Sequence, residues 1–250
     1  MTTIKNVLIG TSLLLSTTVF TQETETRKLS SFTKLDVGGS FDVILESGTE
    51  ESAKIVAEGV SLDKIVTEVK GNTLEAYMKN GNYRNIRVKV YITYKRLEAI
   101  DKSGSGKLTC NSNLTGSAFK LTSGGSGNTV ITKKIEASQV TLSNTGSGSV
   151  KLDALETDDA DLHSSGSGNV EIGEGHAKKQ AIQISGSGNV NAYGLKTIEC
   201  MASVSGSGSI EISVSQSLQG TIVGSGNINY KGDAQITKSA TAGSGRIHKR

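Results

Sequence analysis

The tripeptide Gly-Ser-Gly occurs eight times in this chain of 250 residues, at nearly constant spacing. Its first glycines are 21, 21, 20, 20, 20, 18 and 19 residues apart, and the segments between them are rich in apolar residues. Flexible Gly/Ser linkers have no such regular apolar segments. The spacing is typical of a solenoid, in which one supersecondary unit stacks on the next. We interpret the following glycines as structural corners: Gly104, Gly106, Gly125, Gly127, Gly146, Gly148, Gly166, Gly168, Gly186, Gly188, Gly206, Gly208, Gly224, Gly226, Gly243 and Gly245.

Apolar residues alternate with polar residues on both sides of each tripeptide. The fourth residue before the first glycine is apolar in six successive repeats, from Ile100 to Ala202. The fourth and sixth residues after it are mostly apolar, as at Val170 and Ile172. A period of two indicates half-buried strands. Glycine suits the corner between them because it adopts positive φ without steric cost.

Coils of about 20 residues, stacked roughly 4.8 Å apart, form a parallel β-helix. We therefore predict an all-β fold, a right-handed single-stranded parallel β-helix, because parallel crossovers are nearly always right-handed. The register predicts three columns along the stack. These are a serine column (Ser147, Ser167, Ser187, Ser207), an amide ladder (Asn169, Asn189) and an outward column of alternating charge (Asp159, Lys179, Glu199).

Residues 1–21 have the pattern of a secretory signal peptide. Lys5 precedes a run of apolar and hydroxyl residues from Val7 to Phe20, and small or β-branched residues allow cleavage before Gln22. The run is shorter and more polar than the roughly 20 apolar residues of a membrane span. We expect an exported protein, periplasmic or at the cell surface, with no transmembrane segment in the mature chain.

After the signal peptide we expect a flexible leader over 22–28 and one continuous β-helix domain over 29–250. Residues 101–250 form the regular coils, whereas 29–100 lack Gly-Ser-Gly and are expected to form longer coils and an N-terminal cap.

Two degenerate corners, at Gly38-Gly39 and Gly71-Asn72, lie 33 residues apart and indicate two longer coils before Gly104. Ser61 to Lys70 could instead form a short helix with Ser61 as its N-cap.

The two cysteines, Cys110 and Cys200, are expected to be reduced and buried. They lie four to five coils apart, about 20 Å at strand spacing, whereas the Cα atoms of a disulfide lie within about 7 Å. Both fall at inward positions of the repeat, where a free cysteine acts as a small apolar residue.

Composition and motifs give no sign of catalysis, metal or cofactor. The net charge of +3 is small and the basic residues are scattered, so nucleic acid is not an expected partner. The dense acidic cluster Asp158, Asp159 and Asp161 faces Lys178, Lys179 and Ala181 one coil later, a pattern of solvated ion pairs. His163, His176 and His248 share neither a phase in the coil nor metal-ligand spacing. We predict no catalytic, cofactor-binding or metal-binding residues.

The serial corners Gly166–Val170, Gly186–Val190 and Gly224–Ile228 resemble those of a bacterial family described as putative auto-transporter adhesin, head GIN domain. The upstream pattern Phe32–Val37, followed by Phe41-Asp42-Val43, is similar as well. The resemblance covers residues 29–250. It implies an exported β-helix protein similar in shape to pectin-lyase-like folds, with a role in adhesion and without established catalytic residues.

Two functional hypotheses remain. The first is a structural or adhesion-type module whose flat polar faces bind an unknown surface glycan or protein. The alternative is a carbohydrate-active enzyme, a polysaccharide lyase or hydrolase, built on a β-helix scaffold. An enzyme is expected to carry long insertions between its coils. The coils from Gly104 onward are uniformly short and favour the first hypothesis.

Overall fold

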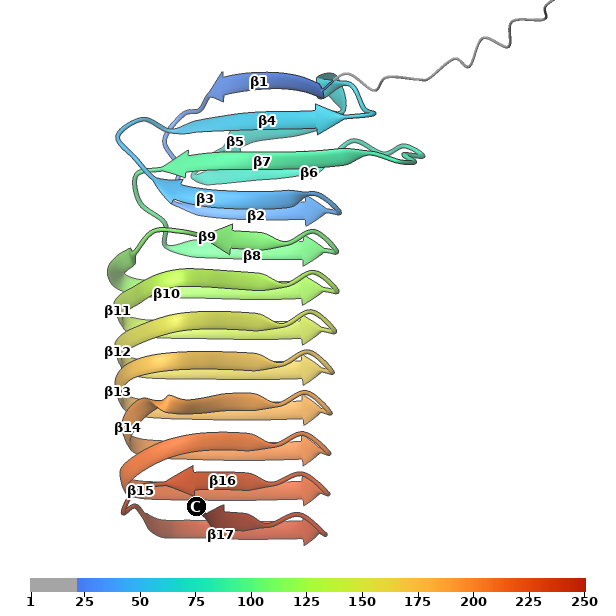
Figure 1. The fold of residues 1–250 in the computed structure, drawn as a ribbon. Helices are drawn as coiled ribbons and strands as arrows, with labels where there is room; N and C mark the ends of the chain where they lie inside the picture. Colours follow the sequence, from blue (N-terminus) through green and yellow to red (C-terminus); the bar gives the residue numbers. More distant parts are fainter. Residues whose placement is uncertain (1–21) are drawn as a thin grey trace, which may run out of the picture.

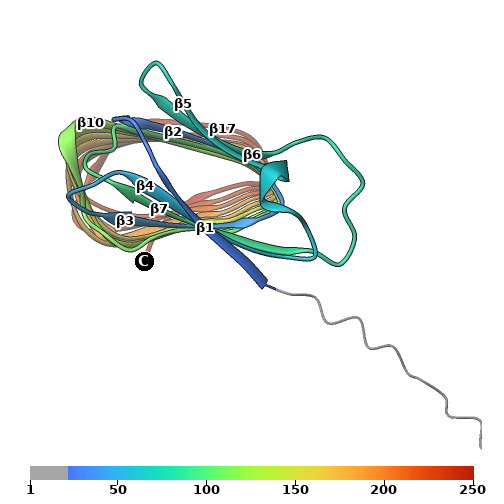
Figure 2. The same cartoon turned by 90° about the horizontal axis from the view of Figure 1, so that it is seen from above.

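The computed structural model describes residues 22–250, so the predicted signal peptide lies outside the described residues. The chain forms a single stack of coils, seen from the side in Figure 1. From above, two facing sheets are joined by a tight corner on one side and by a wider bend on the other (Figure 2). The coils descend with a right-handed turn from the N-terminal end, and the predicted parallel β-helix is confirmed.

Strands account for nearly all of the secondary structure. In chain order they are β1 (Gln22–Lys28), β2 (Lys34–Gly39), β3 (Asp42–Ser47), β4 (Ser52–Glu58), β5 (Ile65–Lys70), β6 (Thr73–Met78), β7 (Arg87–Tyr94), β8 (Ala99–Gly104), β9 (Leu108–Cys110), β10 (Leu114–Gly125), β11 (Thr129–Gly146), β12 (Val150–Gly166), β13 (Val170–Gly186), β14 (Val190–Gly206), β15 (Ile210–Gly224), β16 (Ile228–Lys231), β17 (Gln235–Gly243) and β18 (Ile247–Lys249).

Each Gly-Ser-Gly tripeptide turns the chain from one sheet to the other, and its backbone is packed against the preceding corner. The N–H groups of Ser187 and Gly188 both donate to the carbonyl oxygen of Gly166, at 3.0 Å each. Gly186 has a φ of +135°, and a Cβ there would overlap that same oxygen. A Cβ at Gly188 would overlap the carbonyl oxygen of Gly168. Both glycines are therefore needed because the corners stack backbone against backbone.

The interior follows the predicted alternation, with one polar exception beside the corners. Leu162, Ile182 and Ala202 are buried in one column, as expected for inward positions. Two residues before the corner glycines, however, the first coils bury Lys102, Ser123 and Asn144. Lys102 Nζ donates to Gly127 O at 2.5 Å and Asn144 Nδ2 donates to Gly148 O at 3.0 Å. The Ser123 hydroxyl is bonded to the hydroxyl of Thr129 at 2.9 Å.

The coils that precede Gly104 do not stack in the order of the sequence. Strand β2 pairs in parallel with both β6 and β8, and β3 pairs with both β7 and β9. The β2–β3 coil therefore lies between the β6–β7 coil and the β8–β9 coil. Two coils were predicted here, but they do not stack in chain order. After the β2–β3 coil the chain runs to the N-terminal end of the stack, forms the β6–β7 coil there, and then returns past the β2–β3 coil to form the β8–β9 coil. Gly39 forms a corner that pairs with Gly104, whereas Gly71-Asn72 is the turn of the antiparallel β5–β6 hairpin.

Antiparallel strands close the N-terminal end of the stack. β4 pairs with β7, and β1 pairs with β4, in a register that runs from Gln22 opposite Glu58 to Lys28 opposite Ser52. Residues 22–28 therefore form a strand where we expected a flexible leader, because their main-chain groups enter the ladder. The alternative of a short helix from Ser61 to Lys70 is not observed: a 3₁₀ turn over Leu62–Lys64 leads into strand β5, and the Ser61 side chain makes no capping hydrogen bond.

At the other end, the last coil carries polar residues at inward positions. Ser239 and Thr241 continue the columns of Gly220 and Ile222, and both are exposed. This composition suits a terminal face, since no described coil covers it. Gly220 lacks a side chain because the Ile247 side chain fills the space that a Cβ would need.

The three predicted columns are aligned as expected. Gly146, Gly166, Gly186 and Gly206 pair in register, which places the intervening serines in one column. Asn189 Nδ2 donates to Asn169 Oδ1 at 3.3 Å, which confirms the amide ladder. Asp159, Lys179 and Glu199 are also in register. Within residues 22–250, however, Lys179 forms no ion pair, and the neighbouring Lys178 pairs with Asp158 instead.

Both cysteines are buried and free, as predicted. Burial raises the pKa of the Cys200 thiol to about 12 and also raises the pKa of Cys110.

Candidate functional site: a groove along the bend of the coils

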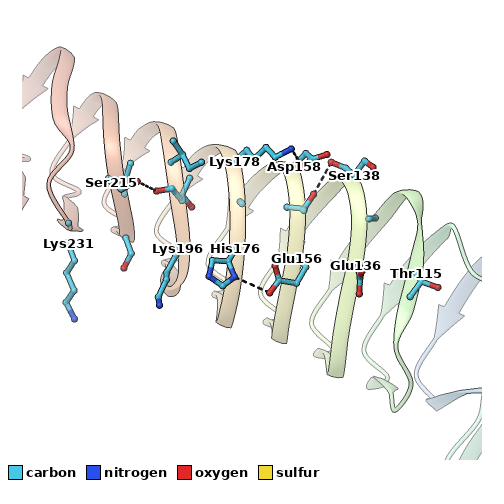
Figure 3. A pocket seen from close by; sticks show the side chains of 18 of the residues that line it. Thr115, Glu136, Ser138, Glu156, Asp158, His176, Lys178, Lys196, Ser215 and Lys231 are labelled. Carbon is cyan, nitrogen blue, oxygen red and sulfur yellow. Dashed lines mark hydrogen bonds and ion pairs between the residues drawn. The ribbon is translucent and has the colours of Figure 1, made fainter.

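A groove of about 1130 Å³ runs along the bend of the stack, midway between successive Gly-Ser-Gly corners. We call it the bend groove and show it in Figure 3. Its floor consists of the small residues Gly116, Ala137, Thr157, Ala177, Thr197 and Val214. One rim carries Thr115, Glu136, Glu156, His176, Lys196, Ser213 and Lys231. The opposite rim carries Ser138, Asp158, Lys178, Ile198 and Ser215.

The groove forms where the alternation of the strand is interrupted. In β14 the buried residues are spaced by two up to Ala192, then by three to Leu195, and by three again from Thr197 to Cys200. Each step of three turns the chain, so a short facet lies between the two sheets. Its floor residue is no larger than valine in the coils that line the groove, and Thr197 is buried with its hydroxyl bonded to Gln180 Oε1 at 3.2 Å. Small inward side chains keep this facet close to the core, which leaves the groove above it.

The first rim changes from acidic to basic along the stack. Glu136, Glu156, His176 and Lys196 are paired in one column, and Ser213 and Lys231 continue it. The carboxylates at the acidic end have partners on the chain. Glu136 contacts Lys134 Nζ at 2.7 Å, and Glu156 contacts His176 Nδ1 at 3.2 Å.

The second rim is held by one ion pair and two hydroxyl groups. Lys178 Nζ lies 2.7 Å from Asp158 Oδ1, and this hydrogen bond raises the pKa of Lys178. The Thr157 hydroxyl on the floor bonds to Ser138 O at 3.1 Å. Further along, the Ser215 hydroxyl donates to Thr197 O at 3.2 Å. The rim is therefore ordered by contacts that cross from coil to coil.

The lysines at the basic end differ from the acidic residues. Neither Lys196 nor Lys231 makes an ion pair within residues 22–250, although both are exposed. Lys231 Nζ instead lies 4.3 Å from the centroid of the Tyr193 ring. The C-terminal half of the bend groove therefore presents two cationic groups without carboxylate partners.

Two of the residues weighed in the sequence as catalytic or metal-binding candidates, Asp158 and His176, lie on opposite rims of the groove. Asp159 and Asp161 lie on the outer face of a sheet. His163 contacts Asp161 at 3.1 Å on that face, and His248 lies on the terminal strand β18.

Among residues 22–250 no group of three or more His, Cys, Asp or Glu side chains is placed to hold a metal ion. The same part of the chain contains no helix long and apolar enough to cross a membrane.

Sequence reasoning identified the Asp158–Lys178 alignment but not the groove. The sequence signal for the groove was a set of four ionisable residues spaced 20 residues apart, namely Glu136, Glu156, His176 and Lys196. These positions fall where the alternation breaks, so a strict period of two does not assign them to either face.

The fold is a β-solenoid, and a groove with polar rims runs along its bend. The family described as putative auto-transporter adhesin, head GIN domain, matches residues 31–234. The chain belongs to this family. No curated protein matches the chain.

Solved structures share the fold over nearly the whole chain. A putative adhesin from Parabacteroides merdae superposes with a TM-score of 0.85 at 22% identity, covering 92% of this chain and 96% of that one. A putative lipid binding protein from Parabacteroides distasonis has a TM-score of 0.84 at 26% identity, with coverage of 92% and 96%. A putative adhesin from Parabacteroides distasonis has a TM-score of 0.84 at 24% identity, with coverage of 92% and 98%.

Proposed function

We propose that this protein is an exported, non-enzymatic adhesion-type module that binds an extended surface polymer, a glycan or a protein segment, along the bend groove. The observation that carries the proposal is the continuity of the groove across coils. Each residue of its first rim pairs with a residue of the next coil from Thr115 to Lys231, with a register shift beside Lys196, over six coil steps or about 29 Å at strand spacing. A site of this length fits a linear polymer better than a compact metabolite.

The family supports adhesion, and the rims support recognition of a polar ligand. Charged groups and hydroxyls line both edges, and small residues line the floor. One structural neighbour is described as a lipid binding protein. An acyl chain would have to lie between the charged rims of this open groove, whereas a polar polymer can hydrogen-bond to them.

The geometry favours binding over catalysis. A polysaccharide hydrolase needs one carboxyl group that stays protonated, usually in apolar surroundings. The carboxylates that line the groove instead lie among polar groups, where Glu156 contacts His176 and Asp158 contacts Lys178.

The experiment compares binding to a panel of linear polysaccharides and surface proteins for the wild type and for two groove variants, Ser138→Trp and Ser215→Trp. Both serines are exposed on the rim, so the bulky side chain narrows the groove without entering the core. Ser187→Trp, on an exposed corner, is the matched control. Loss of binding in the groove variants alone supports the proposal, and equal binding by all variants would refute it.

The same samples test the enzymatic alternative. After long incubation the chain length of a bound polysaccharide is measured by size-exclusion chromatography. We expect an unchanged length, whereas shortening would establish a lyase or hydrolase. Fractionation of cells that express a tagged copy distinguishes the periplasm from the cell surface.

A further inference from the structure

We propose that the C-terminal half of the bend groove binds a linear acidic polysaccharide that carries a carboxylate on every second sugar ring, with Lys196 and Lys231 contacting successive carboxylates. This inference rests on the proposed function and specifies its ligand class.

The groove contains positive charge that is not neutralised by carboxylates of the described chain. Glu136, Glu156 and Asp158 each contact a nitrogen of a basic side chain at 2.7 to 3.2 Å. Lys196 and Lys231 have no carboxylate partner within residues 22–250. A ligand carboxylate that binds them replaces water and does not have to break an existing ion pair. The half of the groove that contains them therefore attracts anions.

The distance between Lys196 and Lys231 matches the spacing of carboxylates in such a polysaccharide. Lys196 pairs with Ser213, and the strand of Ser213 pairs with that of Lys231, so two coil steps separate them. Two steps correspond to about 9.6 Å along the stack. In an extended polysaccharide with alternating acidic and neutral sugars, successive carboxylates are two rings apart. The lysine spacing fits this repeat, with Ser213 opposite the neutral ring.

The same half of the groove offers hydrogen-bond acceptors to the sugar hydroxyls. The hydroxyl of Ser213 donates to Tyr193 O at 2.6 Å, and that of Ser215 donates to Thr197 O at 3.2 Å. Their donors are used within the protein, so their oxygens are available to accept hydrogen bonds from a ligand. The exposed Ile198 offers an apolar contact for a ring face.

The acidic half of the groove limits the length of the ligand. Two coil steps from Lys196 toward the N-terminus, the same column carries Glu156. A third carboxylate in the repeat would meet this side chain, so the site favours a segment with two carboxylates. A dense polyanion such as nucleic acid carries a phosphate about every 3.4 Å per strand and would bring several charges against Glu156 and Asp158. This arrangement selects widely spaced charge.

The test measures binding of tetrasaccharides by isothermal titration calorimetry at low salt. The probes are hyaluronate and unsulfated chondroitin tetrasaccharides, each with two carboxylates on alternate rings, and their carboxyl-reduced forms. We expect binding of at least one acidic probe, no binding of its reduced form, and no gain in affinity for the corresponding hexasaccharide.

Three lysine variants assign the contacts. Lys196→Gln and Lys231→Gln should each weaken binding about two- to fivefold, the range of an exposed ion pair. Lys238→Gln, an exposed lysine on β17 outside the groove, removes the same charge and should leave affinity unchanged.

Failure of both acidic probes to bind, equal binding of the reduced probes, or an equal loss in Lys238→Gln would overturn the inference. If a neutral glycan binds and Ser215→Trp abolishes that binding, the groove function stands and only the ligand class is wrong. If Ser215→Trp leaves all binding intact, the groove function fails as well. Tighter binding of single-stranded DNA than of the tetrasaccharides would also contradict the selection for widely spaced charge.

Discussion

The stacked corners make a direct prediction for Gly186→Ala. A Cβ at this position overlaps the carbonyl oxygen of Gly166, an oxygen that accepts two hydrogen bonds from the following corner. The backbone at Gly186 also has a φ of +135°, which L side chains rarely adopt. A strained backbone of this kind costs about 1–3 kcal/mol, and the displacement of packed atoms costs about 1–3 kcal/mol more. We expect the free energy of unfolding to fall by about 2–6 kcal/mol.

The assay is equilibrium unfolding in guanidinium chloride, followed by circular dichroism. Ser187→Ala is the matched control, because this exposed side chain lies in the same corner and only its main-chain N–H contacts Gly166. We expect the control to change stability by no more than about 0.5 kcal/mol. A loss below about 1 kcal/mol for Gly186→Ala, or an equal loss for the control, would refute the close stacking of the corners.

Three further outcomes test the interior and the register. Both cysteines should be silent toward a thiol reagent until denaturant is added and then titrate as two thiols; a native disulfide would contradict the register. Burial lowers the pKa of Lys102, so the unfolded chain binds the proton more tightly. Wild-type stability should therefore rise relative to Lys102→Met as the pH increases toward the ordinary lysine value of 10.5, and parallel pH profiles would rule out a buried amine. Lys179→Glu places a third carboxylate between Asp159 and Glu199 and should cost about 0.2–1 kcal/mol at low salt, less at high salt; an unchanged stability at low salt would argue against the column.

The regular part of the fold could be predicted because the corner tripeptide fixes its register. With corners 20 residues apart, Asn169 and Asn189 must occupy equivalent places in adjacent coils, and their amides do bond. The same reasoning placed Cys110 and Cys200 at separate inward positions. In these coils the repeat that contains the alternating strands is also the repeat that sets which residues pair between coils, so one sequence pattern predicts both.

The N-terminal region could not be predicted in the same way. Strand alternation at Thr73–Met78 and Arg87–Tyr94 reveals strands but not their neighbours. Nothing local indicates that β6 and β7 pair with the far side of β2 and β3. The Gly71-Asn72 turn suits a hairpin as well as a corner, and antiparallel pairing of β5 with β6 decided between them.

The bend groove lay beyond the sequence argument for a different reason. Strand alternation assigns residues to the inside or the outside, but the chain turns twice between Ala192 and Cys200. The shape of the facet depends on the small size of Ala177 and Thr197 in adjacent coils, which is a packing effect.

The central claim, that the bend groove is the ligand-binding surface, is tested most directly with a fluorophore placed in it. The buried native cysteines allow selective labelling of an engineered one, Ser215→Cys on the rim or Ser187→Cys on the corner. An environment-sensitive label is followed as an acidic tetrasaccharide or a polysaccharide identified as a ligand is added. We predict a saturable change in the emission of the label at position 215 and no change in the emission of the label at position 187. A change at the corner alone, or none at the groove under conditions where binding occurs, would contradict it.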